Sequence, residues 1–260
     1  MATQNEERSP RRVQSVRTAM EIIGFLEERE GAAVTEIAGN LDLTKGTVHT
    51  QLATLREQGF VVKGEEDYHL GLRFLELGEN AKKRLSVPEV AKRELDKLAE
   101  ETDTRTQIIV EENGMAICVY LSRGPNAILP PTDVGYREYL HCIASGKALM
   151  AHLPEERIEW VLSKHGLPAR TESTISDRES LFETLAEVRE RGYALNDEEK
   201  LRGLRAVGAP VLGQDGEPIG AISISDTVRN MDDERFREGG PDRIMGAANI
   251  IEVNYNATHG

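Results

Sequence analysis

His141 and Cys142 are neighbours in this 260-residue chain, and side chains of these types can ligate a metal ion or perform nucleophilic catalysis. We expect them in an extended stretch, where successive side chains point to opposite faces and cannot easily hold one ion. The sequence identifies no third ligand, and it does not place His152 or His165 as a base beside Cys142. A buried structural pair is as good an interpretation as a functional one. We predict no metal site, no catalytic residue and no cofactor.

A second group of residues could bind a small anion. The stretch Ala144-Ser145-Gly146-Lys147 begins a predicted helix, where free backbone N–H groups and the helix dipole favour negative charge. Ser223 and Ser225 alternate on one face of a predicted strand, so both hydroxyls can point toward the same ligand. Each serine taken alone is better explained as a helix cap or a strand-face residue. A ligand site is therefore a hypothesis that depends on the motifs described below.

Residues 34–70 give the strongest functional signal, because they read as a helix, a tight turn, a second helix and a short hairpin. Two strands, 61–63 and 68–70, would form the wing of a winged helix-turn-helix. The expected helix caps are Thr35 and Thr44, the turn is Asp42-Leu43, and the helix stop is Gly59.

The second of these helices has an unusual outer face. Val48, Leu52 and Leu55 share its apolar face by their i, i+4, i+7 spacing. The opposite face carries small residues where an exposed helix normally carries Glu, Lys and Arg, and small groups permit close approach to bases in a DNA major groove. An ordinary helical hairpin with a polar outer face is the opposing interpretation. The expected DNA-contacting residues are Thr35, Thr44, Lys45, Gly46, Thr47, His49, Thr50, Ala53, Thr54 and Lys63.

The net charge argues against DNA binding. Lys and Arg number 32 against 45 Asp and Glu, a net of −13, and residues 1–85 hold 12 against 14. A nucleic-acid-binding surface is expected to be basic. Arg outnumbers Lys by 23 to 9 and acidic residues are spread along the chain, a pattern that resembles proteins of salt-loving archaea. Because net charge reports on solubility and association rather than fold, the DNA-binding interpretation is retained.

The sequence also predicts where the protein resides. It contains no run of about 18 apolar residues that could span a membrane. Its first residues lack the apolar core of a signal peptide. Cys118 and Cys142 are the only cysteines, which fits a reducing compartment and gives neither a disulfide framework nor a zinc-finger spacing. We expect a cytoplasmic protein without a membrane segment.

The predicted elements place these candidates in an α+β fold. Hairpins around Asn113-Gly114 and around residues 214–216 flank three helices, over 144–152, 155–164 and 177–191. Capping-box spacings are expected to start helices at Ser86 and at Ser176, and a last helix covers 233–253. We predict a disordered arm (1–12), a winged helix-turn-helix domain (13–71) that includes a first helix over 15–28, a linker helix (72–86) and a C-terminal domain (87–256) with an antiparallel sheet.

Several motifs, in this order, resemble the isocitrate lyase regulator (IclR) family of transcription factors over nearly the whole chain. The N-terminal ones are Lys45-x-Thr47-Val48-His49 and Tyr68-His69-Leu70-Gly71. The more specific C-terminal ones are LHCIASGKALMAH at 140–152, NDEEKLRGLRAVGAPV at 196–211 and AISIS at 221–225. The chain departs from the family pattern at Gly46, Thr50 and Ala206 and in its acidic wing turn.

The resemblance implies a regulator that binds palindromic double-stranded DNA as a homodimer or homotetramer. It implies a GAF-like C-terminal domain that binds a small-molecule effector, for which we expect a small organic or sugar acid. The implied effector-binding positions are Ile128, Leu129, Pro130, His141, Cys142, Ala144, Ser145, Gly146, Asn196, Ala206, Ser223 and Ser225.

One alternative remains open at this point. The C-terminal domain could be a small-molecule enzyme or a thiol or metal redox sensor, with the N-terminal helices serving as an interaction module. The small outer face of the helix over 44–58 favours the regulator. So does the absence from the sequence of a recognisable nucleophile, base and orienting group.

Overall fold

The computed structural model describes residues 12–127 and 132–259, and the chain divides into two compact units, Met1–Lys83 and Arg84–Gly260. The predicted arm over residues 1–12 and the positions Ile128, Leu129 and Pro130 lie outside the described residues, apart from Arg12. Within the described ranges, no helix is long and apolar enough to cross a membrane.

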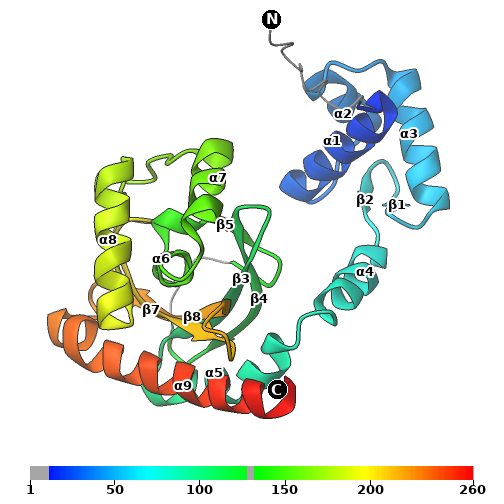
Figure 1. Ribbon diagram of the computed structural model, residues 1–260. Helices are drawn as coiled ribbons and strands as arrows, with labels where there is room; N and C mark the ends of the chain where they lie inside the picture. The colour runs from blue at the N-terminus through cyan, green and yellow to red at the C-terminus, as the bar shows by residue number, and fades with distance from the viewer. Residues whose placement is uncertain (1–11, 128–131, 260) are drawn as a thin grey trace, which may run out of the picture. The chain divides into compact units, whose positions relative to one another are not determined.

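The first unit is the predicted winged helix-turn-helix (Figure 1). Val48 and Leu52 on α3 are buried against Ile22 and Leu26 of α1 and Ile37 of α2, as the apolar spacing predicts. Its elements are α1 (Gln14–Arg29), α2 (Val34–Asn40), α3 (Lys45–Glu57), β1 (Val61–Lys63) and β2 (Tyr68–Leu70). The antiparallel pairing of Val61 with Leu70 closes the wing.

The predicted N-cap is correct for α3 and wrong for α2. Thr44 caps α3 as predicted, because its hydroxyl accepts a 3.1 Å hydrogen bond from the backbone N–H of Thr47. Thr35 is not a cap, since α2 begins one residue earlier and its N-cap is Ala33. The side chain of Glu36 closes that end by accepting a 2.9 Å hydrogen bond from Ala33 N–H.

Helix α4 (Arg73–Lys82) belongs to the first unit and is shorter than the predicted linker helix. None of its residues is buried, and Leu72 and Leu75 are among the most exposed large apolar side chains.

The second unit starts with α5 (Val87–Thr102), which has Pro88 in its first turn. Ser86 makes no side-chain capping hydrogen bond, so the predicted capping box is wrong: Ser86 already has helical backbone angles.

The second unit contains a six-stranded antiparallel sheet in the order β5-β4-β3-β8-β7-β6. The hairpin β3–β4 turns through Asn113 and Gly114, both with positive φ, as predicted for a primed two-residue turn. The two predicted hairpins meet where β3 pairs with β8. The strands are β3 (Arg105–Glu112), β4 (Met115–Arg123), β5 (Arg137–Tyr139), β6 (Ala194–Asp197), β7 (Leu204–Leu212) and β8 (Pro218–Thr227).

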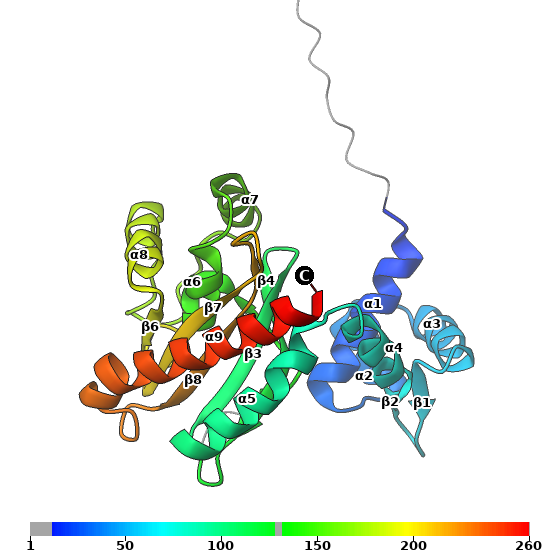
Figure 2. The same ribbon diagram turned by 60° about the horizontal axis from the view of Figure 1, so that its bottom comes forward.

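Helices cover both faces of this sheet (Figure 2). Helices α5 and α9 (Gly240–His259) pack on one face, where Ile108, Val207 and Ile222 belong to their core. Helices α6 (Ala144–Met150), α7 (Glu155–His165) and α8 (Arg178–Arg191) share a second core with residues of the other face. The strands therefore have one face toward α5 and α9 and one face toward α6.

Of two helix starts in this unit, one differs from its prediction and one agrees. Helix α8 is capped by Asp177, whose carboxylate accepts a 2.9 Å hydrogen bond from Ser180 N–H, and not by Ser176. The last helix starts near residue 233 as predicted: residues 233 and 234 are α-helical, a π-helical turn follows over Arg235–Gly239, and α9 continues from Gly240. For α8 the sequence indicates the helix correctly and its cap incorrectly.

Candidate functional site

The outer face of α3 is the candidate nucleic-acid interface in the first unit. Val48, Leu52 and Leu55 are buried, and the predicted contact residues on and before this helix are all exposed. These exposed residues are Thr44, Lys45, Gly46, Thr47, His49, Thr50, Ala53 and Thr54. Thr35 on α2 and Lys63 on β1 are exposed as well.

The threonines on this face use their hydroxyl protons inside the helix. Thr50 Oγ1 donates to the carbonyl oxygen of Gly46 at 3.0 Å, and Thr54 Oγ1 donates to that of Thr50 at 3.2 Å. Their methyl groups and hydroxyl lone pairs remain for contacts with another molecule. Such a surface can make apolar contacts with thymine methyl groups and can accept hydrogen bonds from base amino groups.

The wing is acidic at its tip and anchored by a histidine. Gly64 N–H donates to Asp67 O at 2.8 Å across the turn, which also carries the exposed Glu65 and Glu66. His69 Nδ1 lies 2.9 Å from the carbonyl oxygen of Glu30, and its Nε2 lies 3.1 Å from Asp67 Oδ1. The hydrogen bond to Glu30 and then the Asp67 carboxylate raise the pKa of His69.

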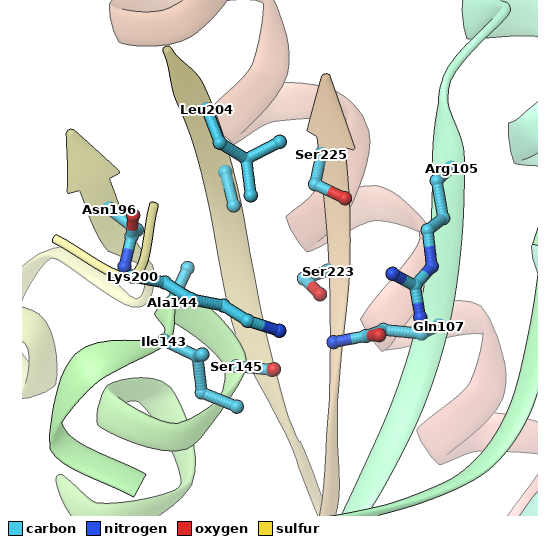
Figure 3. A pocket seen from close by; sticks show the side chains of 11 residues that line it. Arg105, Gln107, Ile143, Ala144, Ser145, Asn196, Lys200, Leu204, Ser223 and Ser225 are labelled. Atoms are coloured by element: carbon cyan, nitrogen blue, oxygen red, sulfur yellow. The ribbon is translucent and has the colours of Figure 1, made fainter. Parts of the chain in front are cut away.

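In the second unit, a pocket lies between the sheet and the start of α6 (Figure 3). Its floor is a row of cross-strand partners over four strands, in which Arg105 pairs with Ser225, Ser225 with Ala206, and Ala206 with Asn196. Gln107 and Ser223 form the neighbouring pair on the same face. The pleat of the sheet therefore aims these side chains into one space.

The other wall comes from α6 and from the loop 198–203. Ile143, Ala144 and Ser145 approach the sheet closely because Gly208 has no side chain. A Cβ on Gly208 would lie 2.6 Å from the backbone nitrogen of Ser145. Lys200 extends from the loop across the opening, and in Figure 3 its ammonium group points toward the amide of Gln107.

The pocket contains buried polar atoms without a partner among the described residues: Arg105 Nε, Ser145 Oγ and Asn196 Oδ1. Their residues are 6 %, 0 % and 2 % exposed. The Arg105 side chain donates a long hydrogen bond, 3.4 Å, to Thr132 O and also interacts with the thiol of Cys118. Buried polar groups in proteins are normally paired, so these atoms mark a place where a ligand can supply the missing partners.

Lys200 connects the pocket to a buried carboxylate. Its Nζ lies 3.7 Å from Glu138 Oε2 and 4.5 Å from the centre of the Tyr136 ring. Glu138 is also held by Arg170 Nη2 at 3.0 Å and by the Tyr136 hydroxyl at 2.7 Å. Burial lowers the pKa of Lys200, whereas hydrogen bonds and nearby cations keep the pKa of Glu138 below its ordinary value despite its own burial.

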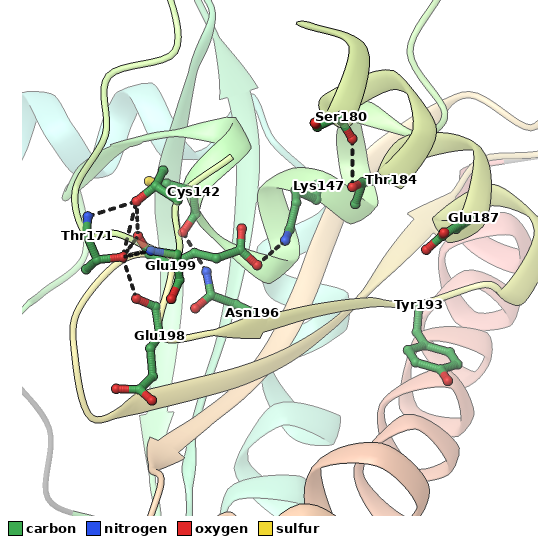
Figure 4. A network of polar contacts seen from close by, with 12 residues as sticks. Cys142, Lys147, Thr171, Ser180, Thr184, Glu187, Tyr193, Asn196, Glu198 and Glu199 are labelled. Atoms are coloured by element: carbon green, nitrogen blue, oxygen red, sulfur yellow. Dashed lines mark hydrogen bonds and ion pairs between the residues drawn. The ribbon is translucent and has the colours of Figure 1, made fainter. Parts of the chain in front are cut away.

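A second buried network holds the loop 198–203 against α6 (Figure 4). Lys147 Nζ donates to Glu199 Oε1, and both side chains are buried. The hydroxyl of Thr174 donates to Glu199 O at 2.6 Å. Asn196 Nδ2 donates to Cys142 O at 2.6 Å, which orients the amide of Asn196 beside the pocket.

Three predicted effector-binding residues do not line this pocket. Residues 140–142 form a 3₁₀ turn, so the expected extended conformation of His141 and Cys142 is wrong. His141 is buried with Nε2 3.2 Å from Pro168 O, and Cys142 Sγ donates to Tyr139 O at 3.3 Å. Gly146 has a packing role, because a Cβ there would lie 2.1 Å from Leu140 O.

The chemistry of the 3₁₀ turn is that of a structural pair. Burial lowers the pKa of His141 and raises the pKa of Cys142 to about 12. Such a pKa favours the protonated thiol, which is a poor nucleophile. Within residues 12–127 and 132–259, no group of three or more His, Cys, Asp or Glu side chains could hold a metal ion.

The structure brings six of the predicted effector residues together and adds others that sequence reasoning missed. The six are Ala144, Ser145, Asn196, Ala206, Ser223 and Ser225. The additional lining residues are Arg105, Gln107, Ile143, Lys200 and Leu204. Alternation along residues 105–112 could have placed Arg105 and Gln107 on one face of their strand, but not beside Ser223 and Ser225.

Comparison with known proteins gives two family matches. Residues 15–65 match the IclR helix-turn-helix domain, and residues 80–249 match the bacterial transcriptional regulator IclR C-terminal domain. The probable HTH-type transcriptional regulator ArcR of Halobacterium salinarum is 37% identical over 248 residues, covering 94% of both chains. The transcriptional repressor IclR of Escherichia coli is 30% identical over 248 residues, covering 94% of this chain and 90% of the relative.

Solved structures show the same fold. The IclR of Thermotoga maritima superimposes with a TM-score of 0.78 at 25% identity, over 94% of this chain and 99% of that chain. An IclR homolog from Microbacterium hydrocarbonoxydans, complexed with 4-hydroxybenzoate, superimposes with a TM-score of 0.79 at 22% identity, over 94% and 99%. The predicted α+β class and the helix-turn-helix are thereby confirmed.

Proposed function

Because the chain belongs to the IclR family of transcriptional regulators, we propose that it binds a palindromic operator as a homodimer or homotetramer, under the control of a small organic or sugar acid. Members of this family are DNA-binding regulators with an effector-binding C-terminal domain. The proposal concerns what is particular to this chain: the residues that contact DNA, the assembly, and the class of effector.

The outer face of α3 carries the DNA-binding part of the proposal. Gly46, Thr50, Ala53 and Thr54 are exposed and short, so the helix backbone can come close to the base edges. Lys45 and His49 lie on the same helix and would contact phosphates on the flank of the groove. Neither position is paired with a carboxylate in the part of the chain that the structure describes.

Exposed apolar side chains on α1 and next to α4 support self-association. Val13, at the N-cap of α1, and Val16 and Met20 on this helix follow an i, i+3, i+7 spacing, and each is more than half exposed. Leu72 and Leu75 are exposed at the start of α4. A second copy of the chain is the occupant that we propose for these surfaces, since a two-fold dimer presents two recognition helices to an inverted repeat.

The pocket of the second unit supports an acid as the effector. Its walls combine hydroxyl groups of Ser145, Ser223 and Ser225 with the cationic side chains of Arg105 and Lys200. Hydroxyl and cationic groups suit a ligand that carries both hydroxyl groups and a carboxylate. The homolog complexed with 4-hydroxybenzoate, a hydroxylated carboxylic acid, has the same fold and supports this class.

The alternative of an enzyme or redox sensor has less support. The relatives are named as transcriptional regulators or repressors. Burial raises the pKa of both Cys118 and Cys142, which disfavours the thiolate that redox chemistry requires.

Selection of bound fragments from genomic DNA, followed by footprinting, tests this function. The expected result is an inverted repeat whose half-sites are about one helical turn (10–10.5 base pairs), or a multiple of it, apart. Light scattering of the free protein should give at least a dimer. Recovery of no enriched sequence would contradict DNA recognition, and tight binding by a monomer would contradict the proposed assembly.

A further inference from the structure

The effector pocket has more cationic groups than carboxylates to pair with them. Arg105 has no carboxylate within ion-pair distance in the described ranges, although it is almost fully buried. Lys200 lies 3.7 Å from Glu138, but Arg170 contacts the same carboxylate at a shorter distance, 3.0 Å. Two cations, Lys200 and Arg170, thus share one carboxylate and Arg105 has none, and a buried charge without a counter-ion is strongly unfavourable.

Arg105 also lines the ligand space with part of its hydrogen-bonding capacity unused. Its Nε has no partner among the described residues, its hydrogen bond to Thr132 O is 3.4 Å long, and its other side-chain partner is the thiol of Cys118, which carries no counter-charge while protonated. In Figure 3 the guanidinium lies on the Gln107 side of the pocket, where the ammonium of Lys200 points from the other side. A carboxylate between them would accept charge-assisted hydrogen bonds from both groups.

The opposite side of the pocket offers an acceptor. Asn196 Nδ2 is bound to Cys142 O at 2.6 Å, so the amide nitrogen is already used. Asn196 Oδ1 is buried and has no donor among the described residues, and Ser145 Oγ, which lines the same pocket, also has no partner among them. A ligand hydroxyl would donate to Asn196 Oδ1 and could accept from Ser145.

We propose that the effector is a small hydroxy acid whose carboxylate binds between Arg105 and Lys200 and whose hydroxyl group donates to Asn196 Oδ1. This inference rests on the proposed function of the pocket as the effector site. It makes Arg105 and Lys200 the specificity-determining residues for charge. Asn196 determines the requirement for a hydroxyl group.

The test uses two sets of matched probes with the full-length protein. Glycolate and lactate carry both groups, glycolamide and lactamide lack the charge, and acetate and propionate lack the hydroxyl. Thermal unfolding is followed against probe concentration at constant ionic strength, because a ligand of the folded state raises the melting temperature with its concentration. We expect the amides to bind at least tenfold more weakly than the hydroxy acids, and the deoxy acids about fivefold more weakly.

Variants of the two cations assign the charge requirement. Arg105→Gln and Lys200→Gln should each weaken glycolate binding at least tenfold, and Arg105→Lys should recover part of the loss. Arg202→Gln is the matched control, because Arg202 lies on the same loop as Lys200 but pairs at the surface with Glu172. It should bind glycolate as the wild type does. Circular dichroism without probe identifies any variant that does not fold, and Arg105→Lys then provides the comparison.

Several outcomes would overturn the inference. Equal binding of an acid and its amide would show that the protein does not recognise the carboxylate charge. Unchanged binding by Arg105→Gln and Lys200→Gln would show that the acid binds outside this pocket. Absence of any melting shift with the hydroxy acids would exclude this ligand class. If a neutral metabolite instead releases wild-type protein from its operator, the proposed function stands and the hydroxy-acid inference fails. If the hydroxy acids bind but no operator is found, the hydroxy-acid inference stands and the proposed function fails.

Discussion

Arg105 and Ser225 are direct cross-strand partners, although β3 and β8 lie near opposite ends of the C-terminal sequence. The adjacent pair, Gln107 and Ser223, extends the same face of the sheet. The pocket floor therefore forms only when the two hairpins join, which requires closing a long loop of chain. A ligand on this floor should stabilise the second unit as a whole and not one hairpin.

A carboxylate on the outer face of α3 should abolish operator binding. Thr50→Glu and Ala53→Glu each place negative charge where bases and phosphates would lie, on exposed positions that do not contribute to the core. We expect affinity to fall at least a hundredfold in a gel-shift assay, with unchanged thermal unfolding.

Thr184→Glu is the matched control for this experiment. Thr184 on α8 donates its hydroxyl to Ser180 O at 2.8 Å, as Thr50 does to Gly46 O at 3.0 Å. The same substitution in the second unit should leave operator affinity unchanged. Normal operator binding by Thr50→Glu would show that another face of the helix reads DNA.

The local parts of this fold could be predicted from the sequence. Helix α3 and the hairpin turn at Asn113-Gly114 depend on residues close in the chain, and the structure has both. The edge strands β5 and β6 have three and four residues, too few for a recognisable alternation. Two predicted caps are wrong. The helix at Thr35 begins before that residue, and Ser86 has helical backbone angles and makes no side-chain capping hydrogen bond.

The pocket could be predicted only in part, because some of its residues come together through contacts between distant parts of the chain. Ser145 and Ser223 lie in motifs that a family resemblance identifies. Arg105 depends on the long-range pairing of β3 with β8, and Lys200 depends on the path of a loop. Neither property leaves a periodic pattern in the sequence, so both residues required the structure.

Operator binding should depend weakly on salt. Basic DNA-binding proteins that make 6–10 phosphate contacts lose roughly 10³–10⁵ in affinity between low and moderate salt, through counterion release. Here Glu65 and Glu66 at the exposed wing turn would take up cations near DNA and offset part of that release. A plot of log affinity against log salt should have a shallow slope, and Glu65→Gln with Glu66→Gln should make it steeper. A steep wild-type slope would contradict this effect of the acidic wing.

The stability of the first unit should depend on the charge of His69. The carbonyl of Glu30 and the Asp67 carboxylate raise its pKa from the ordinary 6.5. Because the folded state binds this proton more tightly than the unfolded state, the stabilisation is complete below about pH 6.5 and is lost as pH rises through the higher folded pKa. NMR titration should give a His69 pKa above 6.5, and thermal unfolding of His69→Gln should lose this pH dependence. A titration midpoint below 6.5 would contradict the model of the wing anchor.

Replacing Ser223 and Ser225 together by alanine should remove the effector response. Both hydroxyls lie on the pocket floor, opposite Gln107 and Arg105, and neither replacement adds volume or charge. Each lost hydrogen bond should reduce ligand binding by about 1 kcal/mol, and by more if its partner is charged. A ligand changes DNA binding only through its different affinity for the two states of the protein, so weaker binding also weakens the switch. Operator affinity without ligand should stay near normal, since DNA contacts lie in the other unit. Calorimetry with the effector measures the change, and undiminished affinity in the double variant would mean that the effector binds outside this pocket.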